Sequence, residues 1–61
     1  MTFKDQVAEY ITLDNAVEYS QETDKYLWVV DNVLDPLELG TTDARVNWIE
    51  DRLDELLNLE N

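Results

Sequence analysis

The chain has 61 residues, of which 15 are Asp or Glu and four are Lys or Arg, so its formal net charge is −11. That charge opposes direct binding to nucleic-acid phosphates or anionic lipid, and the absence of His and Cys removes most catalytic and metal-binding residue sets. Because 44% of the residues are hydrophobic, the composition predicts one small folded domain over residues 1–61 instead of a disordered acidic tail.

The first two expected helices cover residues 2–11 and 14–34. In both, apolar residues recur at intervals of three or four, which gathers them on one face of a helix. These residues are Phe3, Val7, Tyr10 and Ile11, then Leu13, Ala16, Val17, Leu27, Val30 and Leu34. Thr12 or Asp14 can cap the second helix, which can break at the polar residues 22–24.

A short connector precedes the third expected helix, because the only Pro and the only Gly of the chain lie close together at Pro36 and Gly40. Pro36 disfavours the α conformation for Asp35, and Gly40 is expected to supply a positive φ. The third helix covers residues 43–58. Its apolar stripe comprises Val46, Ile49, Leu53, Leu56, Leu57 and Leu59.

These elements predict an all-α fold, a small three-helix domain. The alternative is an α+β fold with a short antiparallel sheet and a C-terminal helix, because residues 10–13 and 26–30 are rich in β-branched and aromatic side chains. A domain of this length buries only about 60% of the surface that its unfolded chain exposes, so a homodimer or another partner is expected to supplement a thin core.

Acidic residues on the third helix fall into two rows. One row comprises Asp43, Glu50 and Asp54, with the neutral Asn47 on the same face between the first two, and the other comprises Asp51 and Glu55. Carboxylates in such a row recur about every 5 Å, close to the roughly 3.4 Å between charges on a DNA strand. Like charges one turn apart also destabilise a helix, which suggests a functional reason for them. With Glu18, Glu22, Asp24, Asp31, Asp35 and Glu38 added, these rows are expected to form one negative band. The residues of this band expected to contact a partner are Asp31, Asp35, Glu38, Asp43, Glu50, Asp51, Asp54 and Glu55.

Catalytic and metal-binding functions have little support. Paired carboxylates one turn apart could serve acid–base catalysis, but so short a chain has little room for the dry pocket that such chemistry needs. A calcium loop starting at Asp35 places Gly40 at the sixth position but puts Leu37 and Leu39 at ligand positions. No enzyme activity, catalytic residue, metal site or cofactor is therefore expected.

Two pairs of residues are expected to stabilise the fold. Arg45 and Arg52, two turns apart, are expected to brace carboxylates inside the molecule. Trp28 and Trp48 are expected in the core, and a Trp left exposed within an acidic surface would serve as an anchor for a partner.

These features favour a non-enzymatic inhibitor that mimics nucleic-acid phosphate and blocks the basic groove of a DNA- or RNA-binding protein. In size, acidity and lack of catalytic residues, the chain resembles small phage-encoded anti-restriction and anti-CRISPR proteins, which implies a viral protein in the host cytoplasm. The lack of Cys, of a signal peptide and of a membrane span also favours a cytoplasmic location. The alternative is a helical interaction or assembly module, in which the apolar stripe binds another helix and the charges only maintain solubility.

Overall fold

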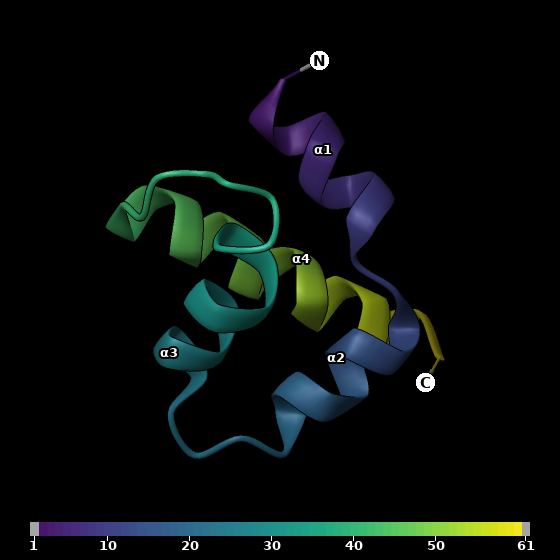
Figure 1. Ribbon diagram of the computed structural model, residues 1–61. Coiled ribbons are helices and arrows are strands. Elements are labelled where there is room, and N and C mark those ends of the chain that lie inside the picture. Colours follow the sequence, from purple (N-terminus) through teal and green to yellow (C-terminus); the bar gives the residue numbers. More distant parts are fainter. Residues whose placement is uncertain (1, 61) are drawn as a thin grey trace.

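The computed structural model describes residues 2–60, with residue 60 described by its backbone only. Four α-helices and one π-helical segment follow in the order α1 (Phe3–Tyr10), α2 (Leu13–Ser20), α3 (Lys25–Val29), η1 (Val30–Leu34) and α4 (Asp43–Glu60) (Figure 1). No strand occurs among these residues, so the all-α prediction is confirmed and the α+β alternative is wrong. Residues 1 and 61 of the predicted domain lie outside the described part of the chain.

The expected second helix is broken, so the described residues form four α-helices instead of three. α2 ends at Ser20, whose hydroxyl donates to the carbonyl of Val17 at 2.6 Å. α3 begins after Asp24, whose carboxylate accepts a hydrogen bond from the amide of Leu27 at 3.0 Å. Such bonds compete with the helical ladder and favour helix ends, which explains why residues 21–24 are not helical.

Threonine side chains begin the other three α-helices. Thr2 and Thr42 each accept a hydrogen bond from the backbone amide three residues on, at 3.2 Å in both cases. Thr12 and Asn15 form a reciprocal capping box with distances of 3.3 and 2.9 Å. Each bond satisfies an N–H group that has no partner within the helix, which helps helices as short as α1 and α2 to form.

The connector after η1 differs from its prediction at two positions. Asp35 keeps the α conformation (φ −63°, ψ −48°) although Pro36 follows it, and its amide donates to the carbonyl of Val30 at 2.9 Å. This wider π turn reduces the clash between a proline ring and the carbonyl four residues earlier. The positive φ lies at Glu38 (59°) and not at Gly40.

Glu38 occupies the position at which a Schellman motif requires left-handed backbone. Its amide and the next amide donate to the carbonyls of Asp35 at 3.0 Å and Leu34 at 2.9 Å. Gly40 instead allows a close approach: Arg45 Nη1 donates to its carbonyl at 2.8 Å, and a Cβ at position 40 would lie 3.2 Å from that nitrogen.

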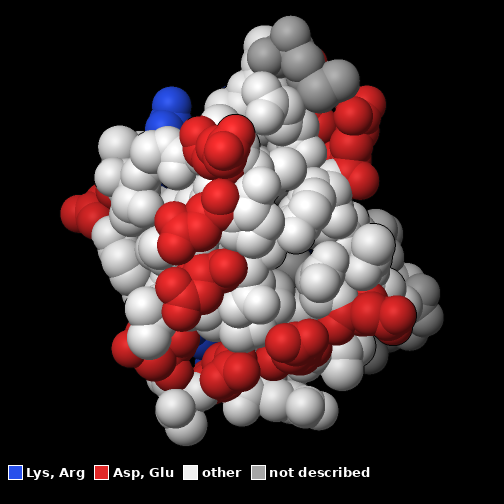
Figure 2. Space-filling view, in the orientation of Figure 1, with Lys and Arg blue, Asp and Glu red and all other residues white. Residues whose placement is uncertain are grey.

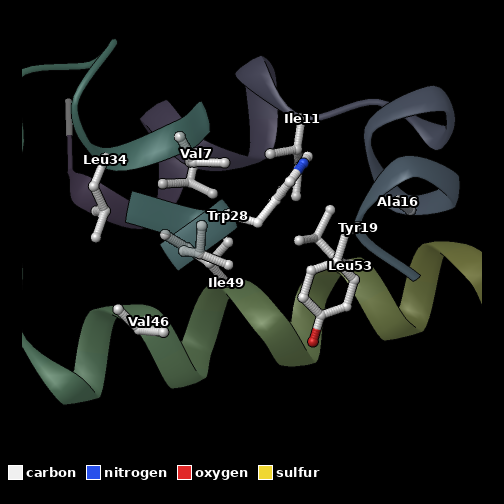
Figure 3. Close-up of a cluster of buried hydrophobic side chains, with 11 residues drawn as sticks. Val7, Ile11, Ala16, Tyr19, Trp28, Leu34, Val46, Ile49 and Leu53 are labelled. Atoms are coloured by element: carbon white, nitrogen blue, oxygen red, sulfur yellow. The ribbon is translucent and has the colours of Figure 1, made fainter. Parts of the chain in front are cut away.

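The core lies between α4 and the other helices, which pack across its apolar side (Figure 1). Figure 3 shows the α4 side chains Val46, Ile49 and Leu53 pointing toward this layer. The buried side chains are Val7, Ile11, Ala16, Tyr19, Trp28, Val29, Val33, Leu34, Val46, Ile49 and Leu53. Leu59 does not continue the stripe and is 79% exposed. Six residues beyond Leu53, the helix has turned its side chain about 120° away from the stripe.

Candidate acidic binding surfaces

Asp43 and Glu50, two of the predicted contact residues, lie on the flank of α4 that faces α2 and α3. Glu50 Oε2 accepts a hydrogen bond from the hydroxyl of Tyr19 at 2.9 Å, and Asp43 Oδ1 accepts one from the hydroxyl of Tyr26 at 3.1 Å. Glu50 is half-buried, whereas Asp43 is exposed. One oxygen of each carboxylate therefore joins α4 to the neighbouring helices.

Both tyrosine hydroxyls have a raised pKa. Burial is the main cause for the pKa of Tyr19, followed by its hydrogen bond to Glu50 and by the negative charges of nearby α4 carboxylates. For the pKa of Tyr26, the hydrogen bond to Asp43 is the main cause and burial adds to it. The two phenols are therefore neutral donors at neutral pH, which suits them to bind carboxylates.

Three further predicted residues, Asp51, Asp54 and Glu55, form a surface that we call the α4 acidic face. All three are exposed, outside the buried stripe of the helix. Glu55 pairs with Arg52 at 3.1 Å, which confirms that this arginine pairs with a carboxylate, but the pair lies on the surface of α4 and joins no second helix. Asp51 and Asp54 make no hydrogen bond or ion pair within the described residues.

The remaining predicted residues, Asp31, Asp35 and Glu38, form a second surface that we call the front acidic row. They are exposed on η1 and the turn after it, whereas Val33 and Leu34 of η1 are buried. In Figure 2, acidic side chains lie in one row over η1 and this turn and in another over α2, on the side of the molecule where α4 lies behind them. The eight predicted residues therefore do not form one band, because the two surfaces lie on different sides of the core.

The cations leave most carboxylates without a neutralising partner. Within residues 2–59, the only ion pair joins Arg52 and Glu55. Arg45 was predicted to brace a carboxylate, but it donates to the carbonyl of Gly40 instead. Three cations lie over aromatic rings: Lys4 is 5.9 Å from the ring centre of Trp48, Lys25 is 5.8 Å from that of Tyr19, and Arg45 is 5.4 Å from that of Phe3.

The two tryptophans differ in burial. Trp28 is 5% exposed, as predicted for a core residue, and its indole N–H donates to Glu18 at 3.3 Å. Trp48 is only half-buried and packs against the edge of the core, so its predicted core position is confirmed in part. It packs edge to face on Phe3 with 5.5 Å between ring centres, and α1 therefore covers only part of it. A shallow hollow of about 200 Å³ is lined by Trp48, Asp51, Arg52 and Glu55.

A second hollow, of about 170 Å³, opens beside the loop between α2 and α3. It is lined by Glu22, Thr23, Asp24, Leu27, Trp28, Asp31 and Asn32. Leu27 was predicted in the apolar stripe but is 51% exposed, because the chain begins a new helix at Lys25 and turns Trp28 and Val29 inward. Both hollows are smaller than the roughly 300 Å³ of typical small-molecule sites. In the described part of the chain, no three acidic side chains gather in a group that could hold a metal ion.

Comparison with protein families, curated sequences and solved structures found no match to this chain. Among the described residues, no helix combines the length and the apolar character needed to cross a membrane. No relative therefore points to a function, and the acidic surfaces are the features from which one can be inferred.

Proposed function

We propose that the chain is a non-enzymatic inhibitor that mimics nucleic-acid phosphate and blocks the basic groove of a DNA- or RNA-binding protein. The observation that carries this proposal is the separation of its charges. The cations lie over aromatic rings, on a carbonyl or in one ion pair, whereas the carboxylates of both acidic surfaces are exposed. A net charge of −11 presented in this way attracts a groove lined by Lys and Arg.

The dimensions of the molecule support the proposal. It measures 31 × 25 × 18 Å, and its longest dimension is close to the roughly 34 Å of one turn of B-DNA. α4 has 18 residues and is therefore about 27 Å long. A domain of this size matches a groove that contacts about one turn of a duplex.

Inhibition would be electrostatic competition. Each exposed carboxylate takes the place of a phosphate oxygen and accepts hydrogen bonds from Lys or Arg of the target. Association is accelerated by the opposite charges and weakens with salt, because the Debye length is only about 8 Å at 0.15 M ionic strength. Restriction and CRISPR enzymes are targets of this class, as the resemblance to small phage inhibitors implies.

The assembly alternative has less support. It depends on the apolar stripe of α4, whose residues Val46, Ile49 and Leu53 are fully buried in the core of the same chain. A second copy could not reach these three residues without unfolding the domain. Only the C-terminal end of the stripe, where Leu56 and Leu57 are half-buried and Leu59 is exposed, is open to another helix.

A competition assay tests the proposed function. The full chain captures partners from a nuclease-treated bacterial lysate along a salt gradient, and each nucleic-acid-binding protein among them is then bound to labelled DNA or RNA. We expect the chain to displace the nucleic acid, measured by fluorescence anisotropy, and to do so far less effectively as salt rises from about 50 to 200 mM.

Two variants with the same charge change separate a specific surface from bulk charge. One carries Asp51→Asn, Asp54→Asn and Glu55→Gln, and the other carries Asp31→Asn, Asp35→Asn and Glu38→Gln. Each adds three units to the net charge, from −11 to −8. We expect the concentration of chain that displaces half of the nucleic acid to rise about tenfold for one variant and much less for the other. Equal losses in both variants, or a captured protein that keeps its nucleic acid, would overturn the proposal.

A further inference from the structure

Leu27 is a large apolar residue left uncovered within the hollow beside the α2–α3 loop. It lies in the first turn of α3 and is 51% exposed. Trp28, which follows it, also lines the hollow while its side chain fills the core. The hollow thus offers a partner an apolar contact that is supported from below by packed side chains.

The charges around Leu27 indicate the chemistry of that partner. Three carboxylates line the hollow, those of Glu22, Asp24 and Asp31, and no cation lines it. Lys25 does not line the hollow, but it lies beside it: its amine donates to the backbone carbonyl of Glu22 at 3.0 Å and lies 5.8 Å from the ring centre of Tyr19, and it pairs with none of the three carboxylates. Asp24 uses one carboxylate oxygen to cap α3, at 3.0 Å from the Leu27 amide, which leaves the other oxygen available.

We infer that this hollow seats an arginine side chain of a basic protein partner, with the aliphatic stem on Leu27 and the guanidinium among the three carboxylates. This inference rests on the proposed function and names one point at which the partner is anchored. Arginine fits better than lysine, because its planar guanidinium is weakly hydrated and can bond two carboxylates at once. The acidic rows of Figure 2 converge near this loop, so neighbouring carboxylates would attract the incoming cation.

A titration followed by NMR tests the inference on the full chain. The probe is arginine with blocked termini (acetyl-arginine-amide), added to ¹⁵N-labelled protein at about 0.15 M salt, where exposed charges are screened beyond about 8 Å. We expect the largest shifts at the amide of Leu27, the indole N–H of Trp28 and the side-chain amide of Asn32. Blocked lysine should bind at least about threefold more weakly. Shifts of equal size along the α4 acidic face, or equal binding of lysine, would overturn the inference.

A matched pair of leucine variants tests the apolar contact. Leu27→Ala should weaken arginine binding about threefold, because the stem loses part of its apolar contact. Leu59→Ala removes the same group from a residue that is 79% exposed on α4 and should leave binding unchanged. The inference is wrong if both variants bind arginine like the unchanged chain.

The same variants distinguish failure of this inference from failure of the proposed function. If the chain displaces nucleic acid from its target and Leu27→Ala competes equally well, the proposed function stands and the arginine seat is wrong. If blocked arginine binds at Leu27 but no target loses its nucleic acid, the seat stands as a site for arginine and the proposed function is wrong.

Discussion

The two flanks of α4 hold their charges by different means. On the flank that faces α2 and α3, the carboxylates of Asp43 and Glu50 accept hydrogen bonds from tyrosine hydroxyls. On the flank that faces α1, the cations of Arg45 and Lys4 lie over the rings of Phe3 and Trp48.

Aromatic side chains thus accommodate charge of both signs beside the core. A phenol offers its O–H group to an anion, and the face of a ring attracts a cation. Three of the four cations, those of Lys4, Lys25 and Arg45, lie over rings, and only Arg52 forms an ion pair with a carboxylate among the described residues. The contrast explains how a chain with so few cations folds and still exposes most of its negative charge.

Truncation of the core between the flanks should have the largest effect. Leu53 is fully buried, so Leu53→Ala should reduce the free energy of unfolding by about 2–5 kcal/mol, measured by urea denaturation. Leu59→Ala should change it very little, because Leu59 is exposed. Equal effects at the two positions would show that the described core does not hold the flanks together.

Loss of the hydroxyl of Tyr19 should have the next largest effect. Tyr19→Phe keeps the ring against Trp28 but leaves the half-buried carboxylate of Glu50 without its donor, which should cost about 1.5–3 kcal/mol. Tyr26→Phe is the matched control, and its smaller cost follows from the exposure of the Tyr26–Asp43 bond. Urea denaturation that ranks these two variants in the reverse order would contradict the tyrosine-based account of this flank.

The raised pKa values of the tyrosines predict sensitivity to alkaline pH. In the folded state both pKa values lie above the ordinary value of 10, so the unfolded chain releases these protons first as pH rises. Their contribution to stability is complete below pH 10 and is lost progressively above it. The melting temperature should therefore fall above pH 10, and less steeply in Tyr19→Phe. An identical decline in that variant would contradict the prediction.

Removal of a cation from the opposite flank should have a smaller effect. Arg45→Met loses the hydrogen bond to Gly40 and the contact with the Phe3 ring but keeps an apolar stem, so about 1 kcal/mol is expected in thermal unfolding. Lys4→Met removes only a ring contact and should cost less. A larger loss for Lys4→Met would show that the carbonyl bond of Arg45 adds nothing.

Added salt should give the smallest effect. Because most exposed carboxylates lack a cationic partner, screening should relieve their repulsion and raise the melting temperature by a few degrees. The double variant Asp51→Asn, Asp54→Asn should show a smaller rise. A melting temperature that does not change with salt would mean that these charges impose no strain on the fold.

Local patterns predicted much of this fold because the forces behind them act within a few residues. The apolar spacing of residues 43–58 predicted α4, and the expected helix over residues 2–11 matches α1 with its two cap residues. The connector was predicted less well. Local rules place positive φ at glycine, but the Schellman hydrogen bonds after η1 require it at Glu38.

For the candidate acidic surfaces, the sequence predicted which residues are involved but not how they are arranged in space. The eight predicted carboxylates are all on helices or on the turn after η1, but helical spacing cannot tell which side of the core each helix will occupy. The tyrosine donors were missed for the same reason, because the carboxylates that they bind are 17 and 31 residues away in the sequence. The exposure of Leu27 was missed because it depends on where the helix after residue 24 packs.

The sequence by itself determined the helical class, the apolar stripe of α4 and the excess of negative charge, since these depend on residue type and on spacing within a few turns. The tertiary structure alone decided that the carboxylates divide between two surfaces, that aromatic rings hold three of the four cations and that Leu27 is left exposed. These features depend on how separate helices pack to bury the most apolar surface, and packing between distant segments is not encoded in any local pattern.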